Sequence, residues 1–290
     1  AVDILAEFPP QNPSDNDTYL MFVAHYDSRY AQIMPKDTVW SYGAADDGYG
    51  LGVALETVSQ LLKQREQWNQ GVKVLFTDAE EVGMMGMKAI WENDRQVFDN
   101  VGLVINIEAR GPYGPALLFE ACPGNEKVMS LYADAAKYKY TYSLTTVVYG
   151  FMPVFTDFNV TKDHIPGLNF STIADINHYH TDRDNFSNIS EKSIQHYGEQ
   201  ILPVAMKYLT GEEYADKDYK TINEYAQSLG FKGDIQPWDW SYYSEKYKNE
   251  KYAISDEAVK PYLELENVKQ AVFMLANKLY GLEFKPAEGI

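Results

Sequence analysis

Continuous apolar runs recur along the first two thirds of the chain. Residues 19–24, 72–77 and 103–107 are each rich in large apolar side chains and each span five or six positions. Strands that are buried on both faces of a parallel sheet carry this uninterrupted pattern, because helices cover them from both sides. The three runs therefore predict interior strands of one sheet.

Amphipathic segments lie between and after these runs. A stripe at helical spacing predicts a helix that begins near Leu51, and its members are Leu51, Ala54, Leu55, Val58, Leu61 and Leu62. Residues 126–138 and 190–209 are also helix-like. The alternation of strands and helices indicates an α/β fold, with a mainly parallel sheet and helices on both of its faces.

Side chains that bind metals follow each predicted strand. His25 and Asp27 follow the first strand, the adjacent Glu80 and Glu81 follow the second, and Glu108 follows the third. Open α/β sheets bind ligands at the carboxyl ends of their strands. We therefore expect these five side chains to lie close together.

The residue types fit the chemistry of a metal hydrolase. His25 can bind zinc through one ring nitrogen while Asp27 takes the N–H of the other nitrogen and fixes the tautomer. Because the side chains of Glu80 and Glu81 diverge, one can bind metal while the other acts as a general base. Glu108 would complete the ligand set of one metal.

A glycine-flanked loop before the predicted helix carries Asp46 and Asp47. A carboxylate can touch two metals that lie about 3.5–4 Å apart, and we expect Asp46 to be this bridge. Asp47 is expected to serve the loop or the start of the helix. His178 and His180 compete for the last ligand position.

The charge balance narrows the class of partner. The chain has 42 acidic and 25 basic residues, a net charge of −17, and a hydrophobic content of 45%. Such acidity disfavours nucleic acid and anionic membranes as partners. No run of 18 apolar residues occurs, so we expect no membrane contact from this chain itself. No sequence feature sets the oligomeric state.

The composition changes near Gly211. The tail is rich in Tyr and Trp, including Trp238, Trp240, Tyr242 and Tyr243, and it lacks the ligand motifs. A late amphipathic helix with Gly281 as its C-terminal cap is predicted by Leu265, Val268, Val272, Leu275 and Leu279. We expect a catalytic domain over residues 1–210 and a mainly helical appendage over residues 211–290.

As a set, the motifs resemble the zinc aminopeptidase family with co-catalytic metals, peptidase family M28. They are His25-Tyr26-Asp27, Gly43-Ala44-Ala45-Asp46-Asp47-Gly48, Glu80-Glu81, Asn106-Ile107-Glu108 and Tyr179-His180-Thr181. The resemblance covers residues 1–210 and implies a three-layer αβα fold with a mixed, mostly parallel sheet. Residues 106–111 look most like bacterial members and vacuolar or reticulum membrane proteases. Many relatives have Asp at the position of Glu108.

The resemblance also implies a role for each site residue. Two zinc ions are expected, with Mn²⁺ or Co²⁺ as possible substitutes. His25 and Glu108 would hold one ion, Glu81 and His180 the other, and Asp46 would bridge them. His180 is preferred to His178 because the family motif runs Tyr-His-Thr.

The remaining expectations from the resemblance concern catalysis and the pocket. Glu80 would be the general base and Asp27 would orient His25. The peptide bond after Asp46 is expected to be cis, and Asp157 and Tyr179 are expected to line the substrate pocket.

The implied activity is hydrolysis of N-terminal peptide bonds, with a water that bridges the metals and with Glu80 as base. Two alternatives stay open. One is a single-zinc enzyme like the glutaminyl cyclases, and the other is a catalytically inactive receptor or scaffold domain of the same fold.

The tail has a resemblance of its own. Residues 236–243 and 263–267 are similar to part of the peptidyl-dipeptidase and thimet oligopeptidase family, and the zinc-binding His-Glu-x-x-His motif of that family does not occur in the sequence. We therefore expect residues 214–290 to be a non-catalytic segment. The chain begins with Ala1 rather than Met, which is typical of a processed product. We expect an extracytoplasmic location: secreted, periplasmic, or the luminal part of a membrane-anchored protein.

Overall fold

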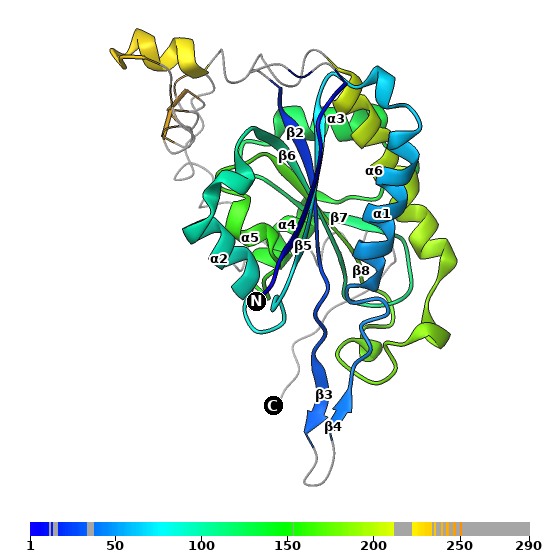
Figure 1. Ribbon diagram of the computed structural model, residues 1–290. Helices are drawn as coiled ribbons and strands as arrows, with labels where there is room; N and C mark the ends of the chain where they lie inside the picture. Colours follow the sequence, from blue (N-terminus) through cyan, green and yellow to red (C-terminus); the bar gives the residue numbers. More distant parts are fainter. Residues whose placement is uncertain are drawn as a thin grey trace, which may run out of the picture. The chain divides into compact units, whose positions relative to one another are not determined.

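The computed structural model describes residues 1–11, 13, 17–33, 38–152, 154–211, 222–233, 235, 239, 242, 243, 246, 247 and 250. Its centre is a six-stranded sheet with the order β1-β5-β2-β6-β8-β7 (Figure 1). The strands are β1 (Ile4–Phe8), β2 (Tyr19–His25), β5 (Gly71–Thr77), β6 (Val101–Ala109), β7 (Leu117–Ala121) and β8 (Gly167–Thr172). The four inner strands are parallel and the two edge strands are antiparallel to their neighbours. The mixed, mostly parallel sheet is therefore confirmed.

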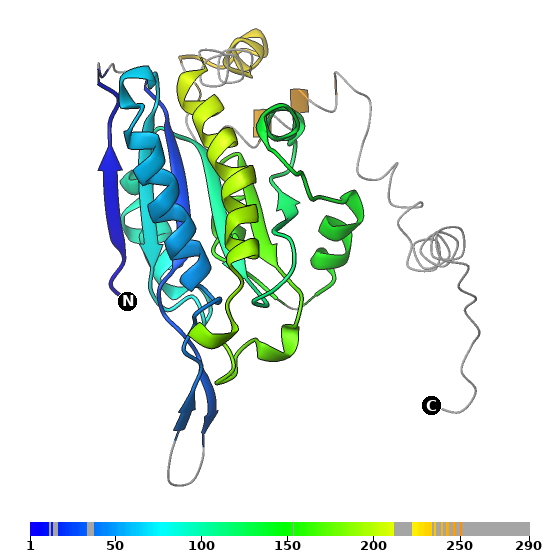
Figure 2. The same cartoon turned by 90° about the vertical axis from the view of Figure 1, so that its right-hand side faces the viewer.

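Helices cover both faces of this sheet (Figures 1 and 2). One face packs against α1 (Gly48–Leu62), α3 (Glu126–Ala135) and α6 (Glu191–Thr210), and the other packs against α2 (Met85–Asn93) and α5 (Phe158–Thr161). Helix α4 (Ser143–Gly150) lies beside β7. The three-layer αβα arrangement agrees with the expectation from the sequence.

Shorter elements also occur, and residues 222–228 form a further helical segment. The 3₁₀ helices are η1 (Arg65–Gln67), η2 (Arg95–Phe98), η3 (Ile176–His178) and η4 (Phe186–Asn188). Strands β3 (Tyr30–Ile33) and β4 (Thr38–Trp40) form a separate antiparallel pair. None of the described helices is long and apolar enough to cross a membrane.

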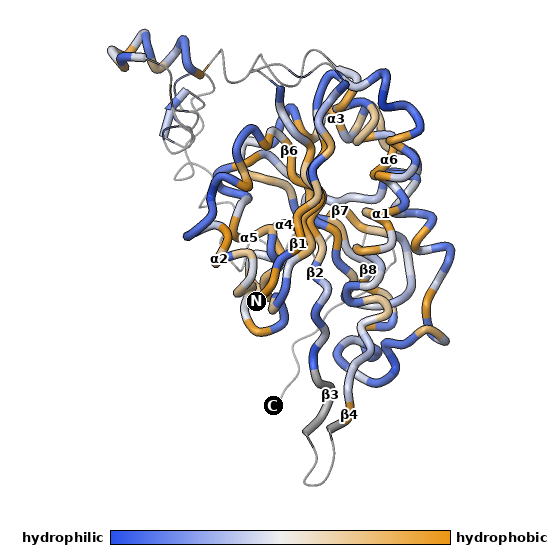
Figure 3. Tube along the Cα trace, viewed as in Figure 1, coloured by the Kyte–Doolittle hydropathy of each residue, from blue (hydrophilic) through white to orange (hydrophobic). Residues whose placement is uncertain are grey.

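Strand β2 shows why the sequence carries continuous apolar runs. Leu20 and Phe22 belong to the core under α1 and α6, whereas Met21 and Val23 belong to the core under α2 and α5. All four side chains are fully buried, because successive residues of a strand point to opposite faces and both faces are covered. The apolar interior of the sheet is visible along the trace in Figure 3.

The predicted apolar stripe of α1 is partly wrong. Leu55 is 58% exposed and Leu62 is 36% exposed, while Val53 and Thr57 are buried in their place. The helix turns the small and branched side chains of Val53, Ala54 and Thr57 toward the sheet, and these allow close packing. Leu55 and Leu62 therefore fall outside or at the edge of the buried stripe, whereas Leu61 lies within it.

Several elements were not predicted. The edge strands β1 and β7 and strand β8 gave no continuous run long enough to mark them, and the helix predicted over residues 126–138 ends at Ala135. The chain divides into two compact units, Ala1–Ser241 and Tyr242–Ile290. The predicted late helix and its Gly281 cap lie outside the described residues, and the domain boundary near Gly211 stays a prediction.

A close approach at the start of β8 generates the first testable prediction. A Cβ at Gly167 would lie 2.9 Å from the carbonyl oxygen of Val104 and 2.4 Å from the ring of Phe158. Since the backbone oxygen cannot move away easily, Gly167→Ala is expected to lower the free energy of unfolding by about 1–3 kcal/mol. Urea denaturation followed by circular dichroism measures this.

Gly52 of α1 is the matched control, because a Cβ there has no atom within 4 Å. Gly52→Ala is expected to raise the free energy of unfolding by about 0.5–1 kcal/mol through helix propensity. Equal effects of the two substitutions would contradict the packing described at β8.

Candidate metal centre

The candidate centre lies at the carboxyl ends of three adjacent strands, β5, β2 and β6. The chain passes from β2 to β5 on one side and then to β6 on the other side, and this reversal is where open α/β sheets form their binding crevice. His25 ends β2, and Glu80 and Glu81 follow β5. Glu108 lies within β6, one residue before its end, and not beyond the strand as predicted.

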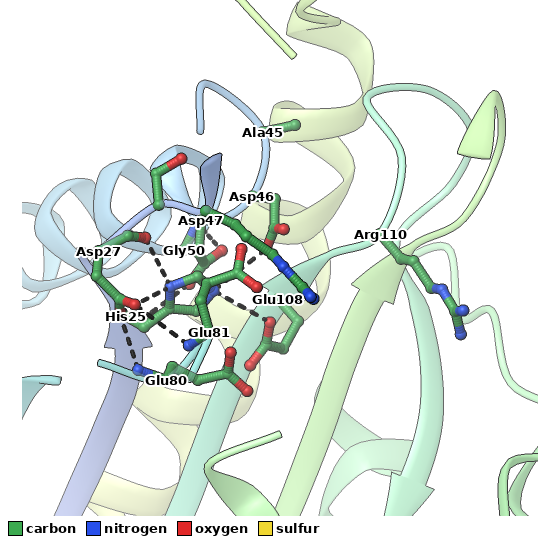
Figure 4. A network of polar contacts seen from close by, with 12 residues as sticks. His25, Asp27, Ala45, Asp46, Asp47, Gly50, Glu80, Glu81, Glu108 and Arg110 are labelled. Atoms are coloured by element: carbon green, nitrogen blue, oxygen red, sulfur yellow. Dashed lines mark hydrogen bonds and ion pairs between the residues drawn. The ribbon is translucent and has the colours of Figure 1, made fainter. Parts of the chain in front are cut away.

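Two groups of possible ligands share one carboxylate. His25, Asp46 and Glu108 form one group, and Asp46, Glu81 and His180 form the other, with the ligand atoms of each group within 4.8 Å of one another. Asp46 Oδ1 lies 3.2 Å from His25 Nε2, and Asp46 Oδ2 lies 3.2 Å from His180 Nε2. Each oxygen of Asp46 therefore faces a different group. Figure 4 shows Asp46 beside His25 and Glu108.

The other ligand atoms complete this geometry. Glu81 Oε2 lies 2.8 Å from His180 Nε2, and Glu108 Oε2 lies 3.7 Å from His25 Nε2. All five side chains expected to bind metal thus come together. His178 does not join them, since its ring packs edge-on against Tyr113 at a centroid distance of 6.2 Å.

The backbone of the Asp46 loop is held by Asp184. The carboxylate of Asp184 accepts the N–H groups of Ala45 at 2.7 Å and of Asp46 at 3.1 Å. The sequence analysis missed Asp184, although the acidic segment Thr181-Asp182-Arg183-Asp184 directly after His180 was a signal that could have drawn attention to it.

Asp47 connects the same loop to α1 and β2. Its side chain caps α1 by accepting the N–H of Gly50 at 2.9 Å, and it accepts the N–H of His25 at 3.3 Å. The predicted role of Asp47 at the helix start is therefore confirmed. The Asp46–Asp47 peptide bond is cis, as expected.

Asp27 contacts both the imidazole of His25 and the backbone of Glu80 and Glu81. His25 Nδ1 lies 3.0 Å from the backbone carbonyl oxygen of Asp27 and 3.5 Å from its carboxylate. The same carboxylate accepts the N–H groups of Glu80 at 3.0 Å and of Glu81 at 3.2 Å. Asp27 therefore joins the end of β2 to the glutamate pair after β5 (Figure 4).

Burial and mutual repulsion dominate the electrostatics of the centre. The pKa of Glu80 is raised to about 8, mainly by burial; the nearby His25 lowers it, while the carboxylates of Asp157 and Glu81 raise it. Burial also raises the pKa of Glu108 well above its usual value. For His180, burial opposes the charged form, but contacts with Asp46 and Glu81 raise its pKa to about 9. The cluster therefore stabilises added positive charge.

The residues fit a pair of divalent cations. Glu81 Oε1 is buried and forms no hydrogen bond with the described residues, and His180 Nε2 faces two carboxylates at once, Glu81 Oε2 at 2.8 Å and Asp46 Oδ2 at 3.2 Å. Buried polar atoms without hydrogen bonds are unfavourable unless another group satisfies them. Two imidazoles and three carboxylates form a nitrogen and oxygen donor set that suits zinc, and manganese or cobalt also accept such donors.

The two expected pocket residues have different surroundings. Asp157 is 1% exposed, accepts a hydrogen bond from the hydroxyl of Thr77, and has its pKa raised to about 6 by burial. Tyr179 stacks on the ring of His180 at a centroid distance of 3.6 Å, and the guanidinium carbon of Arg110 lies 5.5 Å from the Tyr179 ring.

Known proteins of similar sequence are metallopeptidases or proteases by name. Endoplasmic reticulum metallopeptidase 1 of Rattus norvegicus is 30% identical over 207 residues, which cover 68% of this chain and 21% of that protein. The vacuolar membrane protease of Candida dubliniensis is 28% identical over 215 residues, which cover 73% of this chain and 21% of that protein. The chain thus spans about a fifth of the length of these relatives.

Solved structures share the fold. A zinc aminopeptidase from Bacillus subtilis superposes with a TM-score of 0.54 at 17% identity, covering 74% of this chain and 52% of that chain. A glutaminyl cyclase from Bacteroides thetaiotaomicron superposes with a TM-score of 0.52 at 19% identity, covering 70% of this chain and 76% of that chain.

Family models match both parts of the sequence. The model of peptidase family M3 matches residues 210–290, in agreement with the resemblance expected for the tail. The model of peptidase family M28 matches residues 3–205, which include the whole six-stranded sheet and every residue of the candidate centre. The chain therefore belongs to peptidase family M28.

Proposed function

We propose that the chain is the catalytic part of a two-zinc aminopeptidase. The observation that carries this proposal is the position of Asp46, whose two oxygens each lie 3.2 Å from a different histidine. A carboxylate between two ligand groups is the arrangement that two neighbouring metals require. The family and its metallopeptidase relatives support a hydrolase of this kind.

The ligands divide into two sets around Asp46. His25 and Glu108 would hold one ion together with Asp46, and Glu81 and His180 would hold the other together with Asp46. When bound, zinc supplies Lewis acidity that polarises a peptide carbonyl and makes water more acidic. Asp27 orients the imidazole of His25. Its carbonyl oxygen lies 3.0 Å and its carboxylate 3.5 Å from His25 Nδ1.

Glu80 is the general base. It belongs to neither ligand group, and its N–H is held by Asp27, so its carboxylate is free while its backbone is fixed. Its pKa, raised to about 8 mainly by burial, favours taking a proton from the attacking water and returning it to the leaving amine. Added positive charge lowers this pKa toward the base form.

The acidic surroundings favour peptides with a free amino terminus. The ammonium group of such a substrate gains from the carboxylates around the centre. Tyr179, which stacks on His180, lines the substrate pocket, whereas Asp157, at 1% exposed, is too buried to contact a substrate. Residues 1–210 form the catalytic domain and residues 211–290 a non-catalytic appendage, and the names of the membrane-bound relatives support an extracytoplasmic location.

Replacement of the proposed base tests the mechanism. Glu80→Gln is expected to lower kcat on aminoacyl-nitroanilides by about 10²–10⁴-fold, because the proton transfer is lost, while bound zinc per chain stays unchanged. Steady-state kinetics and metal analysis of the same sample measure the two quantities. Glu92→Gln, an exposed position of α2, is the control and should leave kcat unchanged. Full activity of Glu80→Gln would refute the assignment of the base.

Zinc binding is expected to release protons at pH 7. Contacts with Asp46 and Glu81 raise the pKa of His180 to about 9 against the opposing effect of burial, so this ligand is protonated before the metal binds. Because a bound imidazole must lose that proton, zinc affinity should rise with pH until about pH 9 is reached. Calorimetry in two buffers of different ionisation enthalpy measures the release.

The stoichiometry in the same titration separates the alternatives. Two zinc ions per chain support the aminopeptidase centre. One tight ion would favour a single-metal enzyme like the glutaminyl cyclases, and no binding would favour an inactive scaffold. A binding heat that is equal in both buffers would contradict the expected proton release.

A further inference from the structure

A line of buried polar side chains runs from the candidate centre across the sheet to its edge. Asn106 on β6 and Asn169 on β8 are completely buried, and Glu120 on β7 is 5% exposed. The three residues are neighbours in the pairing of the strands, since Asn106 pairs with Asn169 and Asn169 pairs with Glu120. Polar groups at such positions are unfavourable unless hydrogen bonds satisfy them, so their contacts indicate their role.

The line begins at one oxygen of Glu108. Asn106 Nδ2 donates to Glu108 Oε1 at 3.3 Å and to Asn169 Oδ1 at 3.0 Å. The other oxygen of Glu108, Oε2, is the one that lies 3.7 Å from His25 Nε2. The amide of Asn106 therefore holds the oxygen of Glu108 that faces away from His25.

The line ends at an ion pair. Asn169 Nδ2 donates to Glu120 Oε2 at 3.2 Å and to Thr156 Oγ1 at 2.9 Å. Glu120 Oε1 accepts from Lys162 Nζ at 2.6 Å, and Lys162 is 24% exposed at its side chain. A charge-assisted hydrogen bond of this length fixes the Glu120 carboxylate.

The contacts of Glu120 determine which atoms along this line donate hydrogen bonds and which accept them. A carboxylate beside an ammonium group accepts hydrogen bonds and donates none, so Glu120 requires the NH₂ group of Asn169 to face it. Asn169 must then present its oxygen to Asn106, and Asn106 must present its NH₂ group to Asn169 and Glu108. A reversed amide at either position would place oxygen against oxygen.

We propose that Glu120, fixed by Lys162, is a positioning residue that orients Glu108 as a metal ligand through Asn169 and Asn106. This line of hydrogen bonds orients Glu108 Oε2 toward the metal position formed with His25 and Asp46. It does not act on the metal position formed by Asp46, Glu81 and His180. The inference rests on the proposed two-metal centre. Outer hydrogen bonds to a ligand commonly change metal affinity by about 10–100-fold.

The test uses zinc affinity in two backgrounds, measured by competition with a chromophoric chelator. Glu81→Gln removes a ligand from the metal position of Asp46, Glu81 and His180 and leaves the position of His25, Asp46 and Glu108 intact. Glu108→Gln does the reverse. Adding Glu120→Gln is expected to weaken zinc binding by about 10–100-fold in the Glu81→Gln background. In the Glu108→Gln background it is expected to leave affinity unchanged, because the line then ends on no ligand.

Three further variants distinguish positioning from general packing. Glu199→Gln breaks a comparable glutamate–lysine contact at the surface, 3.7 Å from Lys137, and should leave both affinities unchanged. Thr156→Val removes the second acceptor of Asn169 but keeps Glu120, so affinity should stay close to that of the parent. Lys162→Gln, at a partly exposed position, should weaken the same metal position as Glu120→Gln and tests the inference if Glu120→Gln does not fold.

The outcomes separate the two proposals. If the unmodified chain binds two zinc ions and Glu120→Gln has the same effect in both backgrounds, or none, the positioning role is wrong while the centre stands. An equal loss in Thr156→Val would also overturn it. If the unmodified chain binds fewer than two ions, both the centre and the inference fail.

Discussion

The contact of Asp46 with two histidines is the constraint on which the centre depends. Carboxylates gathered at one end of a buried sheet repel one another, and burial makes each charge less favourable. Asp46 lies between His25 and His180, 3.2 Å from each, and this balance requires that its backbone stay fixed. Asp184 supplies that by accepting the N–H groups of Ala45 and Asp46.

The two faces of the sheet bury different kinds of side chain. The face under α1 and α6 carries the larger hydrophobic cluster, with Phe22, Ile105 and Phe170 among its buried side chains. The face under α2 and α5 contains the buried Asn106 and Asn169 beside apolar neighbours. Because the first face supplies a continuous hydrophobic core, the second can bury hydrogen-bonded polar groups that lead to the centre.

The sequence predicted the strands and site residues that local patterns mark. It did not predict the residues whose role depends on contacts with distant parts of the chain. Strand β2 and the positions of His25 and Glu108 followed from local apolar runs and the residues after them. Asp184 and Glu120 contact groups 139 and 49 residues away, and no local pattern marks such partners. Leucine periodicity likewise gave the wrong edge of α1, since packing against the sheet sets which side is buried.

The adjacent residues Glu80 and Glu81 have different contacts, and a third carboxylate, that of Asp27, fixes the backbone from which they extend. Asp27 accepts the N–H groups of both Glu80 and Glu81, which fixes the backbone at the point where their side chains diverge. Glu81 then reaches His180 at 2.8 Å, while Glu80 remains outside both ligand groups. In the proposed mechanism the base must not also be a metal ligand, so Asp27 would serve both to keep Glu80 out of the ligand groups and to orient His25.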